Sequence, residues 1–499
     1  MSYGILKIFS IFTVLSVVGY SLSPKKYRHV VLLALSLGCV GYYSHFGIIY
    51  LTITILTTFG AGLMLEKINN KYVTKGLEKA ERKAIKAIAK KHKKRVVFGY
   101  VTINLGILFG LKYSGMVLAS NNIPGFLKIA MPLGISYYTL QSIGYVVDVF
   151  RGKFKAEKDL FRLGLFVGFL PQLHEGPFGR YDVYEKDLFR NDPIKSEDVF
   201  DGIGTIVWGL FKIFMIANRA AMVADHLFHS YKEYSGVMVI VAGVFFTLQL
   251  YAEFSGYIDV ARGISKIFGI NLAKNFDMPF IAKDVAEFWR RWHISLGEWF
   301  RDYVFYPVST SKFFKKAPDF VVINSALLVV WFLTGLWHGA NVKYISYGLY
   351  YFVLMVGLNC LGPVIRKGLD KIGVKENNMA LSIIKIMLTQ FFVIIGMIMF
   401  RAENLPAFKE MMMHLFETGN SFNLTGIMDI KEVLVLVISL AVLLLPTILK
   451  LKGIAITDYY NKMTMVQKYF VCFGATCLVI IFGAYGLDYI PPDPIYGGF

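Results

Sequence analysis

Two histidines, His293 and His338, are the residues of this chain whose type and setting point most directly to chemistry. Each follows a tryptophan, in the segments FWRRWHISLGEWF and LTGLWHGAN. An imidazole titrates near neutral pH, so it can act as a general base that takes a proton from a hydroxyl group. An ionisable ring at membrane depth is costly unless it faces a wet or protein-lined interior. The setting therefore predicts a functional site; the alternative for each histidine is a core residue satisfied by one hydrogen bond.

Other catalytic signatures are missing from the sequence. A G-x-S-x-G nucleophile elbow, a P-loop, an H-E-x-x-H zinc motif and a dinucleotide-binding fingerprint are all absent. The nine histidines form no cluster with metal-ligand spacing, and Cys472 and Cys477 are not a C-x-x-C pair. We therefore expect neither a metal nor a bound cofactor.

The elements that must position these histidines are membrane helices, because 56% of the residues are apolar and 16% are aromatic. A helix that spans the hydrocarbon core needs about 20 mostly apolar residues. We predict an all-α polytopic membrane protein with about 11 to 13 spanning helices, plus re-entrant or interfacial ones, in a single domain over residues 1–499. The candidate stretches lie near residues 5–22, 29–44, 46–65, 96–113, 128–149, 159–173, 202–222, 236–257, 319–337, 344–362, 379–400, 431–449 and 469–487.

The two segments that carry the histidines differ in character. Residues 288–303, placed at 100° per residue, gather their aromatic side chains and Leu296 in one arc of about 120°, with charged side chains opposite. This pattern predicts one amphipathic helix in the membrane interface or along a polar cavity, with His293 at the edge of its aromatic face. Residues 320–337 are almost uninterruptedly apolar and predict a spanning helix that delivers His338 at its end.

The formal net charge of +19 comes largely from basic residues beside apolar stretches. Such residues set orientation and meet anionic lipid headgroups, so nucleic-acid binding is not expected. The basic residues 25–28 and the basic segment 66–95 predict cytoplasmic loops, which places the N-terminus outside the cytoplasm. Residues 75–95 are expected to form an exposed cytoplasmic helix, either solvated or in contact with anionic lipids. Counting from the basic residues 366–371 places the C-terminus outside as well.

Several motifs carry a resemblance to a known family. NFDMPF (residues 275–280), FWRRWHISLGEWFRDYVFYP and LTGLWHGAN are similar to the central block of membrane-bound O-acyltransferases (MBOATs), in particular their bacterial polysaccharide O-acetylation branch. Other segments resemble the same branch, so the resemblance covers most of the chain: residues 131–152, 170–181, 250–263 and 400–408, and the terminal PIYGGF.

The resemblance implies a ring of spanning helices around a central tunnel, with residues 275–341 as the catalytic block. It implies that His338 is the catalytic base and that His293 orients the donor or acceptor, unless His293 is only an interface histidine. Asn341 is expected to donate a hydrogen bond to a developing oxyanion or to cap a helix end. Trp337 is a further candidate for a substrate contact. Gln141 and Arg180 are candidates for the same role, and ion pairs or helix-end contacts are the alternative for both. For Glu175 and Asp259 those structural roles are expected.

The C-terminal segment 488–499 is a separate feature. Its prolines exclude a continuous helix, so it is expected to be a short extracytoplasmic strap that carries Tyr496 near its end. It resembles the I-Y-x-x-F terminus of polysaccharide-acetylating relatives, in which the tyrosine has been proposed as an acyl relay. Gly497 and Gly498 depart from that pattern, and a tail with an incidental tyrosine is the alternative.

Together these features favour an O-acyltransferase of the bacterial plasma membrane. The expected donor is acetyl-CoA or an acyl carrier protein thioester in the cytoplasm, and the expected acceptor is a cell-envelope polysaccharide. The resemblance also implies an extracytoplasmic partner enzyme of the SGNH type and contact with membrane lipids. The alternatives are D-alanyl transfer from a carrier protein to teichoic acid and, in another class, a secondary transporter or lipid flippase.

Overall fold

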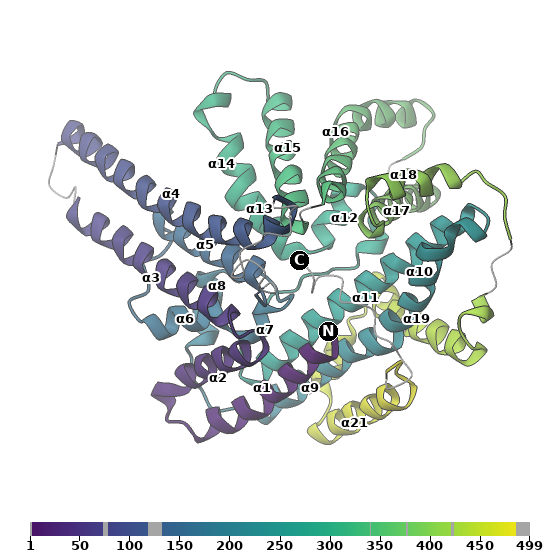
Figure 1. Cartoon of the computed structure of the whole chain (residues 1–499), viewed down its shortest axis with the longest axis horizontal. Coiled ribbons are helices and arrows are strands. Elements are labelled where there is room, and N and C mark those ends of the chain that lie inside the picture. Colours follow the sequence, from purple (N-terminus) through teal and green to yellow (C-terminus); the bar gives the residue numbers. More distant parts are fainter. Residues whose placement is uncertain are drawn as a thin grey trace. The chain divides into compact units, whose positions relative to one another are not determined.

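Residues 2–72, 78–117, 132–339, 341–375, 378–420 and 424–485 are described by the computed structural model in Figure 1. Over these ranges the chain folds into helices joined by loops, with two isolated β-bridges and no β-strand. Ten helices within them are long and apolar enough to cross a membrane, by length and composition. The predicted all-α polytopic fold is therefore confirmed.

Three of the predicted spanning stretches form shorter helices. The stretch 29–44 becomes α2 (Arg28–Tyr43, 16 residues), and 128–149 becomes α5 (Ile135–Arg151, 17 residues) over its described part. The stretch 159–173 is divided into α6 (Leu160–Gly168) and α7 (Leu170–Leu173). These helices are shorter than the roughly 20 residues that a perpendicular span needs.

The described residues divide by their contacts into two compact units, where the sequence predicted one domain. The first unit holds the chain up to Gly202 together with Ala261–Ala273, and the second holds Ile203–Val260 and the described residues from Lys274 onward. Two helices, α9 (Ser196–Phe211) and α11 (Val237–Ile267), contribute residues to both units.

The first unit is built from α2, α5, α6 and α7 together with α1 (Ser2–Leu22), η1 (Lys25–Tyr27), α3 (Gly47–Lys71), α4 (Lys79–Val117) and α8 (Tyr181–Leu188). Helix α3 packs against both α4 and α5, and α2 packs against α1 and α6. Figure 1 shows α3 and α4 as two long neighbouring helices. The basic segment predicted as a separate helix is the first half of α4, whose second half is apolar. One helix thus carries both the exposed lysines and a membrane span.

A glycine allows α5 to begin where it does. Gly134 precedes α5 with φ of 73°, in the left-handed region that glycine occupies without a steric cost. A Cβ at this position would overlap the backbone carbonyl of Leu173 at the end of α7. Gly152 ends α5 with φ of 77° but faces open space. The close approach of the α5 start to α7 therefore depends on Gly134.

In the second unit the helices are η3 (Lys212–Ala217), α10 (Asn218–Ser230), η4 (Tyr231–Glu233), η5 (Pro279–Ile281), α12 (Val285–Arg291), α13 (Ile294–Phe300), η6 (Arg301–Phe305), α14 (Tyr306–Ser309), η7 (Lys312–Phe314), α15 (Asp319–His338), α16 (Val342–Lys371), α17 (Met379–Arg401), α18 (Leu405–His414), η8 (Leu424–Gly426), α19 (Ile430–Leu451), α20 (Ile456–Lys462) and α21 (Met465–Phe482). Of these, η3 and η6 are π-helical. Helices α15 and α16 pack closely against each other through glycines. A Cβ at Gly335 would overlap the Tyr344 carbonyl, and a Cβ at Gly348 would overlap the Trp331 carbonyl. This contact fixes the end of α15, where His338 lies.

The prediction of one amphipathic helix over residues 288–303 is wrong. The segment contains the end of α12, a break at Trp292 and His293, then α13 and the π-helical η6. Trp292 is extended and forms an antiparallel bridge with Phe276, and His293 has a left-handed backbone with φ of 49°. Pairing with a distant loop has replaced the helical hydrogen bonds at this point, so the single aromatic arc does not form.

Gly134→Ala is expected to destabilise the protein more than Gly152→Ala. Both substitutions place an alanine in a left-handed conformation, which costs about 1 kcal/mol. Only the first also pushes a methyl group into the Leu173 backbone, which adds about 1–3 kcal/mol. Thermal unfolding of the two detergent-purified variants measures the difference. Equal melting temperatures would show that α5 and α7 are not in this close contact.

Candidate functional site

His293 occupies the break between α12 and α13, and a neighbouring loop holds that break open. The backbone N–H of Asp277 donates to the Arg291 carbonyl (2.9 Å), and that of Ile294 donates to the Asn275 carbonyl (3.0 Å). These bonds satisfy backbone groups that the interrupted helix leaves without intrahelical partners. A non-glycine residue in the left-handed region costs about 1 kcal/mol or more, so the loop supports a strained position.

The side chain of Asn275 anchors the same break from inside. Asn275 is 1% exposed, and its Oδ1 accepts from the backbone N–H (2.8 Å) and the hydroxyl (2.9 Å) of Ser295. Nδ1 of His293 lies 3.2 Å from Nδ2 and 3.4 Å from Oδ1 of Asn275. Because the two lone pairs of Oδ1 already accept from Ser295, we take the closer Nδ2 amide as the donor to Nδ1. With Nδ1 accepting, the proton of the neutral imidazole lies on Nε2. The shorter of the two contacts therefore favours the tautomer in which His293 is an Nε2–H donor.

Burial keeps the His293 ring neutral. The residue is 3% exposed, and its ring meets Phe254 of α11 edge to face, with the centroids 4.8 Å apart. Desolvation lowers the pKa of His293 to about 3, because an imidazolium loses its hydration in these surroundings. At neutral pH His293 can donate a hydrogen bond, whereas a second protonation is strongly disfavoured.

His338 is the last residue of α15 and lies in an aromatic enclosure contributed by three helices. It is 4% exposed, and its ring is edge-on to Tyr347 of α16 (5.8 Å) and Phe400 of α17 (5.1 Å). Gly339 follows in an extended conformation that ends the helix, and a Cβ there would meet the ring of Tyr344. The W-H-G sequence thus combines a helix end with room for a packed tyrosine.

Trp337 brings the two histidines together. Its indole contacts the His293 ring with the centroids 5.8 Å apart and the His338 ring with the centroids 4.9 Å apart. The two imidazoles therefore contact the same indole, although they belong to separate helical segments. This His293, Trp337 and His338 cluster, all within the second unit, is the candidate functional site.

Asn341 takes the helix-end position that was one of its two predicted roles. It is the N-cap of α16, where its Oδ1 accepts from the backbone N–H of Lys343 (3.0 Å), and its side chain is exposed. The next charged residue, Lys343, is buried and donates through Nζ to the Ala402 carbonyl (2.6 Å). Neither Lys343 nor Asn275 was singled out from the sequence, although Asn275 begins the NFDMPF motif.

Gln141 and Arg180 belong to the first unit, whereas the histidine cluster belongs to the second. Gln141 is buried in α5, where Nε2 donates to the Phe166 carbonyl (2.5 Å) and Oε1 accepts from the Gly179 N–H (3.0 Å). It thereby ties the loop before Arg180, the N-cap position of α8, to two helices. Glu175 lies in that loop with φ of 56°, 3.7 Å from His174 through its carboxylate.

Asp259 and Tyr496 are the remaining residues singled out from the sequence. Asp259 accepts from buried Lys212 at 2.7 Å, so the structural ion pair predicted for it is confirmed. Tyr496 lies outside the described residues. Within the described ranges, no group of three or more His, Cys, Asp or Glu side chains could hold a metal ion.

Asn275→Ala is expected to loosen His293 and make its ring accessible. The change removes the acceptor of the buried Ser295 N–H and hydroxyl, at a cost of about 1–3 kcal/mol, and the amide that faces Nδ1. Labelling with diethylpyrocarbonate, read by peptide mass spectrometry, should increase at His293 in the variant. Exposed His229 serves as the internal reference. Unchanged protection of His293 would contradict the anchoring role of Asn275.

Comparison with known proteins finds one matching family and several relatives. A model of "MBOAT, membrane-bound O-acyltransferase family" matches residues 165–368, which include both histidines. The chain is 34% identical over 331 residues to "Probable alginate O-acetylase AlgI" of Pseudomonas aeruginosa, with 64% of this chain and 60% of the relative covered. It is 28% identical over 281 residues to "Peptidoglycan O-acetyltransferase" of Helicobacter pylori, with 49% and 52% covered.

A third relative is matched over most of its length. The chain is 30% identical over 332 residues to "Teichoic acid D-alanyltransferase" of Bacillus subtilis, with 62% of this chain and 82% of the relative covered. The chain spans about 60% of the length of the alginate O-acetylases that it matches. The family match covers both histidine-bearing motifs, and the relatives named above are acyltransferases by name. The chain belongs to the membrane-bound O-acyltransferase family.

Proposed function

We propose that this protein is an O-acyltransferase that moves an acetyl group from a thioester donor to a cell-envelope polysaccharide. The observation that carries the proposal is the buried cluster of two histidines on one indole, in a chain of this family. The family membership also argues against a transporter or flippase. The sequence pattern of basic loops supports a donor on the cytoplasmic side, an acceptor outside and both termini outside.

The two histidines would have different roles. His338 takes the proton of the acceptor hydroxyl as its oxygen attacks the thioester carbonyl carbon, the C–S bond breaks, and the proton passes to the leaving thiolate. His293, neutral with its proton on Nε2, donates to the carbonyl oxygen as negative charge develops on it. Asn341, Gln141 and Arg180 are candidates for contacts with the substrates. Trp337 would keep the two imidazoles in place by contacting both rings.

D-alanyl transfer to teichoic acid from a carrier protein is the second candidate. The observation in its favour is the coverage of the Bacillus subtilis relative, 82% of its length. Acetyl transfer is preferred because the alginate O-acetylases and the peptidoglycan O-acetyltransferase are all named for O-acetylation. Purified protein supplied with radiolabelled acetyl-CoA, acetylated carrier protein or D-alanylated carrier protein distinguishes the donors.

His338→Ala is expected to lower acyl transfer by about 10²- to 10⁴-fold, because it removes the general base. The amount of protein in the membrane should stay the same, and His229→Ala, at an exposed position, is the matched control. Transfer of radiolabel by the purified variants measures the effect. Wild-type transfer by His338→Ala would eliminate the assignment of His338 as the base.

His293→Ala separates the donor role from a purely structural one. If His293 donates to the developing oxyanion, the variant accumulates normally and transfers slowly, and His293→Gln, which keeps an N–H donor, recovers part of the activity. Failure of both variants to accumulate as folded protein would leave His293 with a structural role only.

The proposal includes a relay through Tyr496 to an extracytoplasmic enzyme of the SGNH type. Twelve residues from position 488 can extend about 40 Å, enough to enter the outer half of a hydrocarbon core of about 30 Å. The tyrosine hydroxyl would accept the acyl group as an ester and then pass it to the partner enzyme. A tethered hydroxyl also has a local concentration of roughly millimolar without a binding site of its own.

Tyr496→Phe is expected to block polysaccharide acylation as fully as His338→Ala while thioester binding persists. Mass spectrometry of the C-terminal peptide should find an acyl adduct on Tyr496 that is missing in His338→Ala and accumulates without the partner enzyme. A cysteine at position 497 should react with an impermeant thiol reagent added outside cells. Full polysaccharide acylation by Tyr496→Phe would eliminate the relay.

A further inference from the structure

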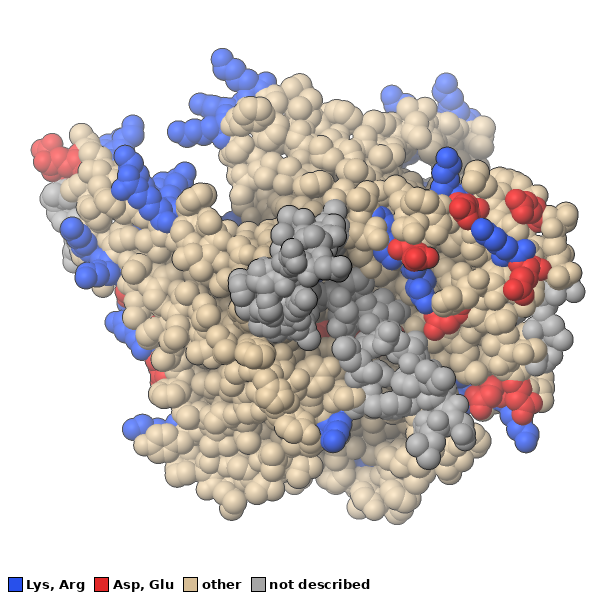
Figure 2. Space-filling model, in the orientation of Figure 1, with Lys and Arg blue, Asp and Glu red and all other residues tan. Residues whose placement is uncertain are grey.

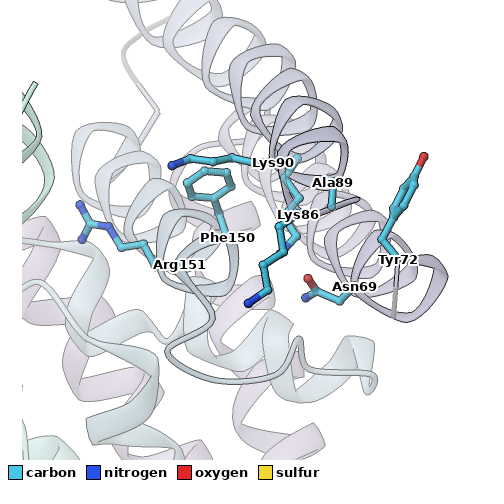
Figure 3. A pocket seen from close by; sticks show the side chains of 8 residues that line it. Asn69, Tyr72, Lys86, Ala89, Lys90, Phe150 and Arg151 are labelled. Atoms are coloured by element: carbon cyan, nitrogen blue, oxygen red, sulfur yellow. The ribbon is translucent and has the colours of Figure 1, made fainter. Parts of the chain in front are cut away.

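A basic pocket lies in the first unit, between the C-terminal ends of α3 and α5 and the basic first half of α4. It has a volume of about 500 Å³ and is lined by Asn69, Tyr72, Lys86, Ala89, Lys90, Lys93, Phe150 and Arg151. Asn69 lies near the end of α3, and Tyr72 directly follows that helix. The lysines and Ala89 belong to α4, and Phe150 and Arg151 are the last residues of α5. Figure 3 shows Lys86 and Lys90 extending from one face of α4, with the Phe150 ring beside Lys90.

The lysines of the pocket are spaced so that their positive charges lie on one face of α4. Lys86, Lys90 and Lys93 recur at intervals of four and three residues, which places them on one face of a helix. Ala89 lies on the same face and is buried, and its small side chain leaves the space between the lysines open. The stacked rings of Tyr72 and His92, 5.8 Å apart, hold the end of α3 against α4.

Negative charge does not balance these lysines. None of the pocket-lining residues is acidic. Arg151 is 3.9 Å from Asp148, which is also 3.6 Å from Lys153. Among the described residues, by contrast, no carboxylate lies within ion-pair distance of Lys86, Lys90 or Lys93. Three like charges around one concavity repel each other, and a bound anion would remove that repulsion.

The position of the pocket along its helices indicates the kind of anion. The apolar part of α3 ends at Leu65, shortly before Asn69, and that of α4 begins at Val96, shortly after Lys93. The pocket therefore lies where three helices leave the apolar layer, at the level of lipid phosphates. Figure 2 shows Lys and Arg side chains gathered at the outer ends of α3 and α4. Basic pockets between membrane helices at this level suit phosphorylated lipid headgroups.

We propose that this pocket binds a phosphate-bearing anion whose source is the headgroup of an anionic phospholipid. Three lysines and Arg151 supply the donors for the phosphate oxygens, Asn69 supplies an amide, and Phe150 offers an apolar surface to the glycerol end. The volume is within the range of small-ligand sites, about 300–1,000 Å³. The site is separate from the acyl-transfer proposal, because none of its residues belongs to the histidine cluster.

The matched variants differ in which face of α4 they change. Lys86→Gln/Lys90→Gln/Lys93→Gln removes three charges from the pocket. The control, Lys91→Gln/Lys94→Gln/Arg95→Gln, removes three charges from exposed positions of the same helix that do not line the pocket. Ala89→Leu fills the pocket without changing any charge. The lysines substituted in the pocket and in the control are solvent-accessible, so both triple variants should fold, and their melting temperatures check this.

Native mass spectrometry of the full-length protein in uncharged detergent measures binding of phosphatidylglycerol, phosphatidylcholine and the soluble adenosine 3′,5′-bisphosphate. Wild type and control should retain phosphatidylglycerol in preference to phosphatidylcholine. The pocket triple variant and Ala89→Leu should bind phosphatidylglycerol at least about tenfold more weakly than wild type does. Equal loss in the pocket and control triple variants would mean general attraction to α4 and would overturn the site.

The soluble probe separates the two sources of phosphate. If wild type binds the bisphosphate but shows no preference for phosphatidylglycerol, and the pocket variant loses that binding, the phosphate chemistry is kept and the lipid source is rejected. If neither probe binds more weakly to the pocket variant than to the control, the proposal fails altogether. Should Ala89→Leu not fold, the comparison of the two triple variants still decides.

Discussion

Backbone pairing between the loop 275–278 and residues 291–294 is the constraint on which the histidine site depends. In a chain surrounded by lipid, every buried N–H and carbonyl must find a partner within the protein. A break in a helix is tolerated only if another segment supplies those partners. The hydrogen bonds from Asp277 to Arg291 and from Ile294 to Asn275 do so, and they let His293 adopt a left-handed backbone. Without that loop, the local sequence would favour one continuous helix.

Close helix packing supplies the other half of the site. Gly335 and Gly348 let α15 and α16 approach through their backbones, and this fixes the end of α15 against Tyr347 and the neighbouring helix α17. The histidine at that end is then surrounded by rings, which leave few other positions for it. Buried aromatic contacts therefore place His338, and buried hydrogen bonds place His293. The two mechanisms meet at Trp337.

Buried and solvent-accessible cations are treated differently in this chain. Two buried cations of the second unit show this: Lys212 donates to Asp259, and Lys343 donates to the Ala402 carbonyl. A buried charge without a partner would cost several kcal/mol, so about this much is avoided by each contact. The lysines of the α4 pocket are solvent-accessible and escape that cost, which is why they can remain without a carboxylate among the described residues.

The sequence alone determined the helical fold, the spanning helix that ends at His338 and the motifs that place the chain in its family. These features depend on runs of apolar residues and on short patterns, which are local. Only the tertiary structure decided that residues 288–303 are broken at His293. Their aromatic periodicity fits a helix well, and the competing partner is the distant Asn275 loop, whose pairing no local period records. The meeting of both histidines at Trp337 and the concave arrangement of the α4 lysines against α3 and α5 were decided in the same way. Each requires segments far apart in the chain to pack together, and packing depends on the shapes of whole helices.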